Sequence, residues 1–241
     1  MIIAGPCLYT DESITDEIFD TALKLRNVAD IFRCKLWGGG TRAEIYNPGM
    51  GEKGIELFNK IRDEIGIQCI TEAQIPRHFV VLTKNRIESW IGGRNSQNYG
   101  LIEKACIMNL GFPVIIKRGF GMTTFEVEGI YDIVTKIHGK ECIIVERGIN
   151  TFDRTPESRW SPDLKCALFM KYNRPDIFEN FMVDCSHSIF KSEMVGDVYN
   201  AFKAIGVNNF MFECWAHPEL ATSDNGLAIS VDDLKHILGS K

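Results

Sequence analysis

The sequence predicts a single (β/α)8 TIM barrel of the α/β class, spanning residues 1–241 as one domain. Short apolar runs recur about every 30 residues, with amphipathic helical patterns between them. Eight such units without a break in composition are typical of a closed parallel barrel. The alternative is an open doubly wound sheet. It is disfavoured because no GxGxxG motif follows a strand, and no helix opens directly behind the glycines at 38–40.

The expected strands are short and apolar on both faces, as parallel strands beneath helices are. They are 2–4, 31–35, 68–71, 89–92, 114–117, 142–146, 181–184 and 209–212. The expected helices have apolar residues at helical spacing. They are 16–28, 52–65, 98–109, 124–137, 192–205 and 231–238. Two segments are less regular: 73–83 is short, and 150–170 holds a long loop rich in Arg, Pro and Ser.

Composition excludes several classes of protein. Lys plus Arg is 27 and Asp plus Glu is 32, so the net charge is −5. A mildly acidic chain without a basic tract is a poor candidate for binding nucleic acid or an anionic membrane. No apolar run reaches the roughly 18 residues of a spanning helix, and the N-terminus lacks the pattern of a signal peptide. Eight dispersed cysteines with no CxxC pair favour the reducing cytoplasm over a disulfide framework.

One set of residues at the predicted strand ends has the chemistry of metal ligands. In a barrel the active site lies at the carboxyl ends of the strands. The set consists of Cys7, His187, Glu213 and Asp224. A thiolate, an imidazole and two carboxylates suit a divalent ion such as Mn, Fe, Co or Zn. The alternative is a buried cysteine, a surface histidine and two solvated acids.

A second set at the strand ends is cationic. It consists of Arg33, Arg94, Lys117 and Arg147, with Lys35 and Arg118 as further candidates. Buried cations are costly without anionic partners, so this set predicts a ligand that carries a phosphate and a carboxylate. The alternative is a ring of salt bridges to Glu72, Glu146 and Glu213. Together the two sets suit a small phosphorylated carboxylic acid that reacts with a metal-bound carbonyl.

Nine short motifs occur in order along nearly the whole chain. They are GPC at 5–7, GMGEKG at 49–54, TE at 71–72, IGGRNSQN at 91–98, KRG at 117–119, ERGINTF at 146–152, DCSH at 184–187, FEC at 212–214 and SD at 223–224. On these motifs the chain resembles the 3-deoxy-D-arabino-heptulosonate-7-phosphate (DAHP) synthases, and more broadly their relatives that make 3-deoxy-octulosonate 8-phosphate. The resemblance implies a (β/α)8 barrel that condenses phosphoenolpyruvate with an aldose phosphate, erythrose 4-phosphate first, and releases inorganic phosphate. The pathway implied is the shikimate pathway of aromatic amino acid biosynthesis.

The resemblance also implies roles for individual residues. The implied metal ligands are Cys7, His187, Glu213 and Asp224. The implied contacts to phosphoenolpyruvate are Arg94 and Lys117, with Arg147 and Arg33 as further contacts and Glu72 as a polar organiser. Lys117 is the first candidate for donating a proton to the new alkoxide, and Cys7 and His187 complete the catalytic set.

Two expectations concern organisation. Family members are commonly dimers or tetramers, so we expect a homo-oligomer, with Trp37, Trp90, Trp160 and Phe169 as exposed apolar candidates for its interface. The alternative is that these four residues anchor the core or a loop. The chain begins at the first strand, so we expect no appended regulatory domain.

The chain departs from the family after the second strand. Family members carry Lys-Pro-Arg-Thr there, and its Lys and Arg hold the two substrates. In this chain Gly38 and Gly40 take the places of that Lys and Arg, and only Thr41 is kept. Arg42 and Lys35 are candidates to replace the lost charges.

This departure leaves three alternatives to a DAHP synthase. They are the same chemistry on another aldehyde such as arabinose 5-phosphate, a non-catalytic binding protein, and an unrelated metal-dependent aldolase or lyase. The glycines at 38–40 are placed like a flexible loop over the mouth, because glycine adopts unusual dihedral angles freely. The sequence leaves open whether this loop is rigid or mobile.

Overall fold

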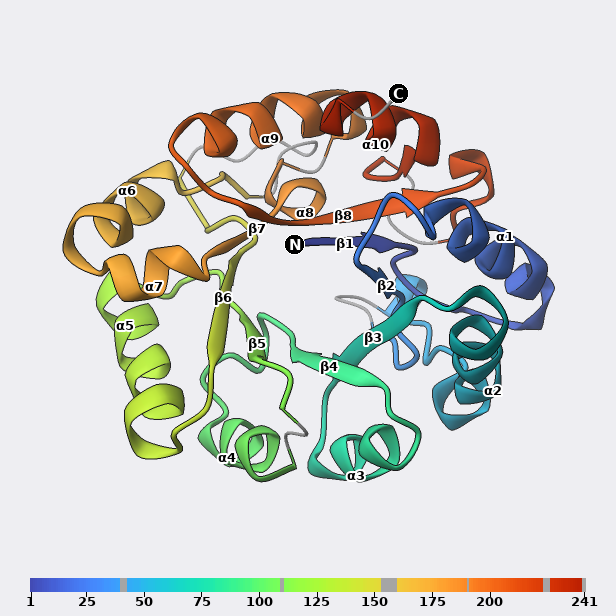
Figure 1. Cartoon of the computed structure of the whole chain (residues 1–241), viewed down its shortest axis with the longest axis horizontal. Coiled ribbons are helices and arrows are strands. Elements are labelled where there is room, and N and C mark those ends of the chain that lie inside the picture. The colour runs from blue at the N-terminus through green and yellow to red at the C-terminus, as the bar shows by residue number, and fades with distance from the viewer. Residues whose placement is uncertain (40–42, 109–110, 153–159, 190, 223–225, 240–241) are drawn as a thin grey trace.

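The chain folds into a closed parallel barrel surrounded by helices (Figure 1). The computed structural model describes residues 1–39, 43–108, 111–152, 160–189, 191–222 and 226–239. Strands β1 to β8 pair in chain order, and β8 pairs back with β1, which closes the barrel. A short strand, β9, pairs with the far end of β8. The predicted (β/α)8 TIM barrel is confirmed.

The strands are short, as parallel barrel strands are. They are β1 (Ile2–Gly5), β2 (Ile31–Arg33), β3 (Gln68–Ala73), β4 (Glu88–Ile91), β5 (Val114–Lys117), β6 (Cys142–Glu146), β7 (Met182–Asp184), β8 (Asn209–Trp215) and β9 (Ile229–Ser230). The α-helices are α1 (Thr15–Leu25), α2 (Ile55–Lys60), α3 (Pro76–Lys84), α4 (Tyr99–Met108), α5 (Thr124–Asp132), α6 (Leu164–Asn173), α7 (Pro175–Glu179), α8 (Cys185–Ile189), α9 (Val195–Ala204) and α10 (Val231–Leu238).

The structure differs from the sequence predictions mainly at element boundaries. Strand β2 ends at Arg33, and Lys35 instead forms a single parallel bridge with Leu8 on the segment after β1. The irregular segment 150–170 contains the start of α6, where the Asp163 carboxylate accepts a hydrogen bond from the Cys166 amide. The short helix α8, which directly follows β7, is absent from the predictions.

Alternate residues of each strand point into the barrel, because side chains in a strand have a period of two. The inner cluster consists of Ile3, Ile31, Ile70, Trp90, Ile115, Ile143, Val145, Met182 and Met211. A larger apolar cluster, which includes Phe32 and Phe58, lies between the strands and the helices. Two residues after most of these inner apolar residues, toward the carboxyl end of the strand, the sequence has a glycine or a charged residue. Examples are Arg33 after Ile31, Lys117 after Ile115 and Glu213 after Met211. The barrel therefore has an apolar floor and a polar mouth.

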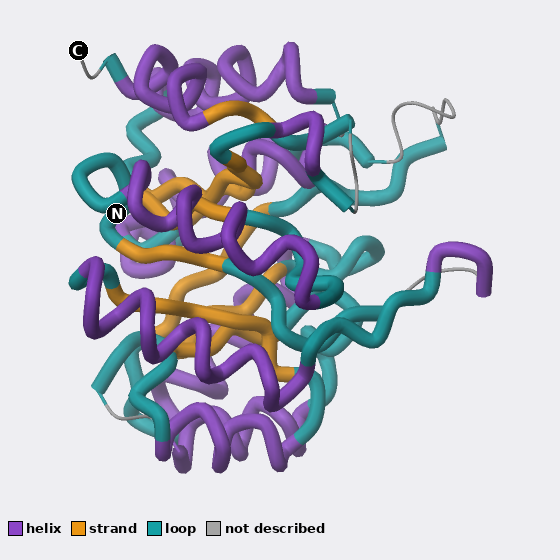
Figure 2. The backbone as a smooth tube through the Cα atoms, turned by 90° about the vertical axis from the view of Figure 1, so that its right-hand side faces the viewer, coloured by secondary structure: helices purple, strands orange, loops and turns teal. Residues whose placement is uncertain are grey.

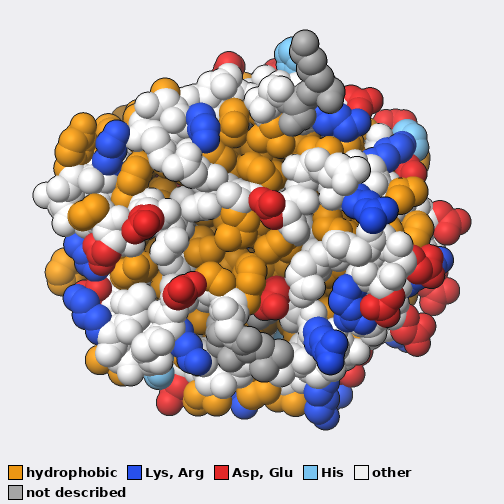
Figure 3. Space-filling model, in the orientation of Figure 1, with side chains coloured by type: hydrophobic (Ala, Val, Ile, Leu, Met, Phe, Trp, Pro, Cys, Tyr) orange, Lys and Arg blue, Asp and Glu red, His pale blue; other side chains and the backbone are white. Residues whose placement is uncertain are grey.

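The two ends of the barrel differ. Figure 2 shows long connections on the side where the strands end, with one arm standing clear of the body. Figure 3 shows the opposite face, where hydrophobic side chains gather at the centre with acidic side chains around them. Met1 and Phe112 pack against the inner cluster. The mouth at the carboxyl ends is therefore where the fold can build a site.

None of the described helices is both long enough and apolar enough to cross a membrane.

One interface expectation is wrong. Trp90 is 1% exposed and lies in the inner cluster, so it cannot contribute to an oligomer interface. Trp37 is half-buried and stacks on His78, and Trp160 is half-buried and stacks on Phe120. Only Phe169 of the four expected residues is exposed, at 40%.

Trp90 is expected to be a main source of stability in the barrel interior. Trp90→Ala should lower the free energy of unfolding by about 3–5 kcal/mol, because the floor cannot collapse around so large a cavity. Urea unfolding followed by circular dichroism measures this. Phe152→Ala is the matched control, since Phe152 is fully exposed and its loss should change stability by less than about 0.5 kcal/mol. Equal effects of the two substitutions would contradict the buried position of Trp90.

Candidate active site

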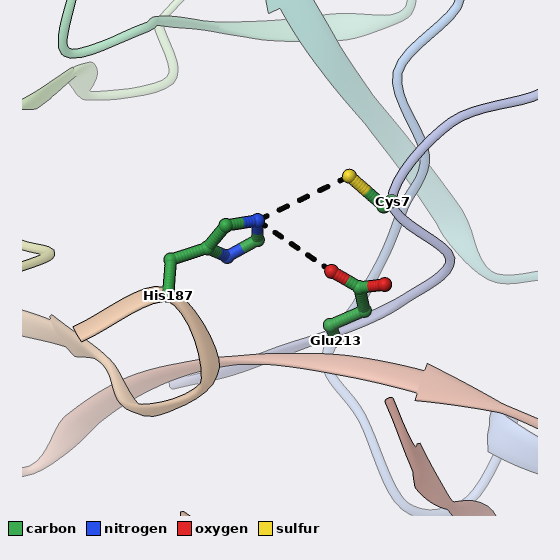
Figure 4. A group of neighbouring side chains, drawn as sticks. All are labelled: Cys7, His187 and Glu213. Carbon is green, nitrogen blue, oxygen red and sulfur yellow. Dashed lines mark hydrogen bonds and ion pairs between the residues drawn. The ribbon is translucent and has the colours of Figure 1, made fainter. Parts of the chain in front are cut away.

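Three of the four expected metal ligands meet at the barrel mouth (Figure 4). Cys7 follows β1, His187 lies in α8 and Glu213 lies in β8. The His187 Nε2 atom is 4.0 Å from the Cys7 Sγ atom and 3.5 Å from a Glu213 carboxylate oxygen. One ligand atom from each residue lies within 4.8 Å of the other two, and all three side chains are buried. This spacing and these donor atoms fit a single divalent ion.

Asp184, at the end of β7, holds His187 in place. Its carboxylate lies 3.0 Å from the His187 Nδ1 atom and also accepts a 3.1 Å hydrogen bond from the His187 amide. A proton on Nδ1 directed at this carboxylate leaves the Nε2 lone pair facing Cys7 and Glu213. Burial, opposed by Asp184, lowers the pKa of His187 to about 4, so the imidazole is neutral at pH 7. Neutral imidazole is the form that binds metal.

The same carboxylate neutralises Lys117. The Lys117 Nζ atom lies 2.5 Å from a carboxylate oxygen of Asp184, and both side chains are buried. Burial raises the pKa of Asp184, but His187 and Lys117 outweigh it and hold that pKa well below its usual value. Burial lowers the pKa of Lys117 to about 8, with Arg33 adding to the shift and Asp184 opposing it. Lys117 can therefore exchange a proton near neutral pH.

Arg33 and Arg147 bring two further buried cations to the mouth. Arg33 is 1% exposed, and among the described residues its Nε and Nη1 atoms find no hydrogen-bond acceptor. Burial lowers the pKa of Arg33, but the nearby Cys7, Asp184 and Glu213 raise it by more than burial lowers it. The net effect is a raised pKa, so the guanidinium group stays charged. Arg147 follows β6 and is also buried. Guanidinium groups held in a poorly solvated mouth suit a bidentate anion such as a phosphate or a carboxylate.

The remaining expected contacts lie nearer the edge. Glu72 is half-buried, and its carboxylate packs against Gly92, where a Cβ atom would lie 2.3 Å from one oxygen. Arg94 is exposed, with its Cζ atom 5.7 Å from the centre of the Phe120 ring. Lys35 is half-buried, and its amide donates a 3.1 Å hydrogen bond to the Cys7 carbonyl.

The expectation that Arg118 contacts substrate needs correction. Its side chain points away from the barrel interior, because it follows the inward-pointing Lys117 by one position. One nitrogen lies 2.8 Å from both the Glu146 and the Asp163 carboxylates, and two others donate to the Met122 carbonyl. Arg118 is thus committed to a buried ion pair beneath the mouth. For Glu146, the alternative of internal salt bridges holds.

Three expected residues lie outside the described part of the chain: Thr41, Arg42 and Asp224.

Gly38 and Gly39 make backbone contacts with the segment that returns from the loop, and Gly40 lies outside the described residues. The Gly38 amide donates a 2.8 Å hydrogen bond to the Pro48 carbonyl, and Gly39 forms an antiparallel bridge with Asn47. A Cβ atom on Gly38 would lie 2.1 Å from the Asn47 carbonyl oxygen. Position 38 therefore accepts only glycine in this arrangement, and no side chain can reach the mouth from it.

Sequence reasoning missed three functional candidates. Asp184 lies in the DCSH motif, three residues before His187, and this spacing was the available signal. Phe120 and Trp160 stack on each other beside Arg147, and nothing in their spacing predicts this contact.

Two other groups of candidate ligand residues occur among the described residues. Glu146, Asp163 and Cys166 surround the committed Arg118. Glu17, Asp20 and His217 lie at the surface, where His217 pairs with Glu17 at 2.8 Å. Neither lies with the buried cations at the mouth.

The chain is a closed parallel barrel that brings a Cys–His–Glu group and buried cations together at the carboxyl ends of its strands. This combination is typical of barrel enzymes that bind an anionic substrate beside a metal ion. The chain belongs to the DAHP synthetase I family, whose profile matches residues 1–239. The expected family membership and the expectation of an enzyme of this family are confirmed.

Individual relatives agree with the family. A phospho-2-dehydro-3-deoxyheptonate aldolase of Thermotoga maritima is 28% identical over 98% of this chain and 67% of its own length. A 2-dehydro-3-deoxyphosphooctonate aldolase of Fusobacterium nucleatum is 26% identical over 99% of this chain and 87% of its own.

The fold matches solved structures of the same kind. The crystal structure of the Thermotoga maritima DAHP synthase superposes with a TM-score of 0.85 at 27% identity, covering 99% of this chain and 67% of that one. A truncated form of a DAHP synthase from Thermotoga maritima gives 0.82 at 26% identity and covers 99% and 84% of the two chains.

Substituting only one partner of the buried ion pair between Arg118 and Glu146 is expected to destabilise the fold. Arg118→Met should lower the free energy of unfolding by about 3–5 kcal/mol, because it leaves a buried carboxylate without its cation, and Glu146→Gln is the second single variant. The double variant Arg118→Met with Glu146→Gln should recover at least half of that loss. Urea unfolding of both single variants and the double variant measures the coupling. Additive losses would show that the pair does not act as a unit.

Proposed function

We propose that the chain catalyses a metal-dependent condensation of phosphoenolpyruvate with an aldose phosphate, which gives a 3-deoxy-2-ulosonate phosphate and inorganic phosphate. Erythrose 4-phosphate is the first candidate acceptor. The observation that carries the proposal is the meeting of the Cys7–His187–Glu213 group with Arg33, Lys117 and Arg147 at one barrel mouth. The family membership and the relatives' names support it.

The cations account for phosphoenolpyruvate. This substrate carries a phosphate and a carboxylate close together, and one cation would neutralise it only in part. Arg33 has buried donor atoms available for an acceptor. Arg33 and Lys117 both lie over the Trp90 ring, at 5.4 and 5.3 Å from its centroid. Arg147 and Arg94 add charge beside Phe120, with their Cζ atoms 4.5 and 5.7 Å from the centroid of its ring. Buried donors arranged before binding also stabilise charge that develops during reaction.

The ligand group accounts for the aldehyde. Cys7, His187 and Glu213 would hold the ion, with Asp224 as the expected fourth ligand, and Mn, Fe, Co and Zn all accept this mixture of donors. When bound, such an ion supplies Lewis acidity to a carbonyl oxygen. The protein's own contribution is orientation: Asp184 fixes the His187 ring, and the Ser186 hydroxyl accepts a 2.9 Å hydrogen bond from the Glu213 amide.

Lys117 is the proposed proton donor. An attack of C3 of phosphoenolpyruvate on the aldehyde forms the new C–C bond and creates an alkoxide, which takes a proton from Lys117. C2 becomes electron-poor and adds water, and the proton that this water releases restores the ammonium form of Lys117. Loss of phosphate from the resulting hemiketal phosphate completes the reaction. Lys117 carries a proton below about pH 8, and Asp184 keeps its ammonium group in the mouth.

A second acceptor is favoured by one observation. Gly38 stands where the family resemblance places a substrate-holding lysine, and the Asn47 carbonyl fills the space that any side chain would need. The binding of the aldose phosphate must therefore use other groups, and Lys35, three residues before Gly38, is a candidate on the described chain. The second candidate function is the same condensation on a different aldehyde, such as arabinose 5-phosphate.

Location and assembly remain predictions. No disulfide joins the eight cysteines, all of which lie within the described residues, and this is compatible with a reducing cytoplasm. A dimer or tetramer is expected from the family resemblance.

Phosphate release tests the proposed function. With phosphoenolpyruvate and Mn²⁺, release of inorganic phosphate should require an aldose phosphate and should stop with EDTA. Comparing erythrose 4-phosphate, arabinose 5-phosphate and ribose 5-phosphate by kcat/KM identifies the acceptor. Cys7→Ser should lower both activity and metal content at least tenfold, because it removes a buried ligand.

Each result separates the alternatives. Highest kcat/KM with erythrose 4-phosphate would exclude the second acceptor. Binding of phosphoenolpyruvate without turnover on any sugar would indicate a non-catalytic binding protein. Aldose-dependent release that EDTA does not affect would contradict the metal-dependent part of the proposal.

The pKa of Lys117 predicts an alkaline limit of activity. Because burial lowers this pKa to about 8, the donating ammonium form is lost as pH rises through about 8 rather than above 10. The pH profile of kcat should therefore fall above about pH 8, and Lys117→Met should lower kcat by at least about 100-fold. Lys171→Met is the control, since the Lys171 Nζ atom donates to the Ile205 carbonyl away from the mouth. An unchanged alkaline limb in Lys117→Met would remove Lys117 from this role.

A further inference from the structure

We propose that Phe120 and Trp160 form an aromatic platform that positions Arg147 and Arg94 for the phosphate group of phosphoenolpyruvate. In this proposal Trp160 is a positioning residue that sets the affinity for that anion. The inference rests on the proposed function and adds the means by which the same site holds its substrate.

The geometry of the platform is well defined. The Phe120 and Trp160 rings stack with centroids 5.0 Å apart and planes 13° from parallel. The Arg147 Cζ atom lies 4.5 Å from the Phe120 centroid and 4.1 Å from the Trp160 centroid. The Arg94 Cζ atom lies 5.7 Å from the Phe120 centroid. All three distances are within the range of a cation–π interaction, so both guanidinium groups are attracted to one aromatic pair.

The backbone brings the platform together from two connections. The Asn150 amide donates a 2.8 Å hydrogen bond to the Phe120 carbonyl, which joins the connection after β5 to the one after β6. Ile149 and Ser161 exchange two 3.0 Å hydrogen bonds in an antiparallel bridge, which places the neighbouring Trp160 over the mouth. The later connection therefore folds back on its own start.

Gly148 makes this close return possible. Its φ angle is +90°, which side-chain-bearing residues rarely adopt. A Cβ atom there would lie 2.8 Å from the Trp160 Cβ atom and 3.0 Å from the Ser188 Cα atom. Gly148 directly follows Arg147 in the chain. Its missing side chain therefore leaves room for Trp160 beside the Arg147 guanidinium group.

Stacking gives a physical reason for tighter anion binding. A free arginine side chain loses rotamer freedom when it binds an anion, and a stacked guanidinium group has already lost much of it. The two rings also exclude water from the part of the guanidinium group that they contact. Since Arg147 is buried and Arg94 is exposed, Trp160 acts first through Arg147.

Substitutions at Trp160 test the platform. Trp160→Leu should raise the KM and the calorimetric Kd for phosphoenolpyruvate about tenfold, because it removes the closest ring from Arg147. It should change kcat and the KM for the aldose phosphate by less than about threefold. Trp160→Phe keeps a ring and should restore the phosphoenolpyruvate affinity to within about threefold of the wild-type value.

The matched control is Phe19→Leu. It removes an aromatic ring that lies 4.5 Å from the Lys60 Nζ atom on the helical shell, and it should leave phosphoenolpyruvate affinity unchanged. Thermal midpoints of all variants identify any that fail to fold.

The outcomes separate this inference from the proposed function. Wild-type affinity in Trp160→Leu, or equal loss in Trp160→Leu and Trp160→Phe, would overturn the platform. If the wild type does not bind phosphoenolpyruvate, the proposed function fails, and inorganic phosphate becomes the probe for the same variants. Weaker phosphate binding by Trp160→Leu than by Trp160→Phe would then support the platform. Absence of phosphate binding by the wild type would overturn it too.

Discussion

The mouth of this barrel depends on one buried carboxylate. Asp184 accepts a hydrogen bond from the Lys117 ammonium group and another from the His187 ring, so it serves the anion site and the ligand group at once. A buried ammonium group without a counter-ion is costly, and so is a buried carboxylate. Asp184 and Lys117 each offset the cost of burying the other charge. Neutralising or displacing either one therefore also affects His187, which Asp184 holds in place. The orientation of the imidazole and the charge of the lysine are therefore set together.

The barrel can hold these charges because its interior changes character along the strands. An apolar floor around Trp90 lies directly beneath Arg33 and Lys117, and both cations lie within 5.5 Å of the Trp90 ring centre. The floor excludes water from below, which strengthens every electrostatic interaction at the mouth. Outside the strands, Arg118 and Glu146 form a second charged pair that joins neighbouring connections rather than facing substrate. The adjacent residues Lys117 and Arg118 thus form two separate buried ion pairs, one at the mouth and one outside the strands.

The connection after β2, which contains Gly38, is the segment where this sequence departs from the Lys-Pro-Arg-Thr motif of the family resemblance. Its base is held by backbone hydrogen bonds on both sides, from Gly38 to Pro48 and from Gly51 to Leu36. The Gln74 side chain adds a hydrogen bond to the Gly38 carbonyl, which ties this connection to the connection after β3. At position 38 the Asn47 carbonyl oxygen occupies the space that a side chain would need. The buried cations Arg33 and Lys117 remain in place beside this connection.

The sequence by itself determined the barrel, because eight short apolar runs between amphipathic segments can bury their surface in few other ways. The rule that strand ends meet also brought Cys7, His187 and Glu213 to one mouth, and the structure agrees. Trp90 was misplaced because strands that are apolar on both faces do not reveal which face is inside. The separate roles of Lys117 and Arg118, the bridging role of Asp184 and the contact of Trp160 with Arg147 were decided only by tertiary structure. Each depends on which face of a strand turns inward or on a connection that folds back, and such contacts join residues that have no fixed spacing along the chain.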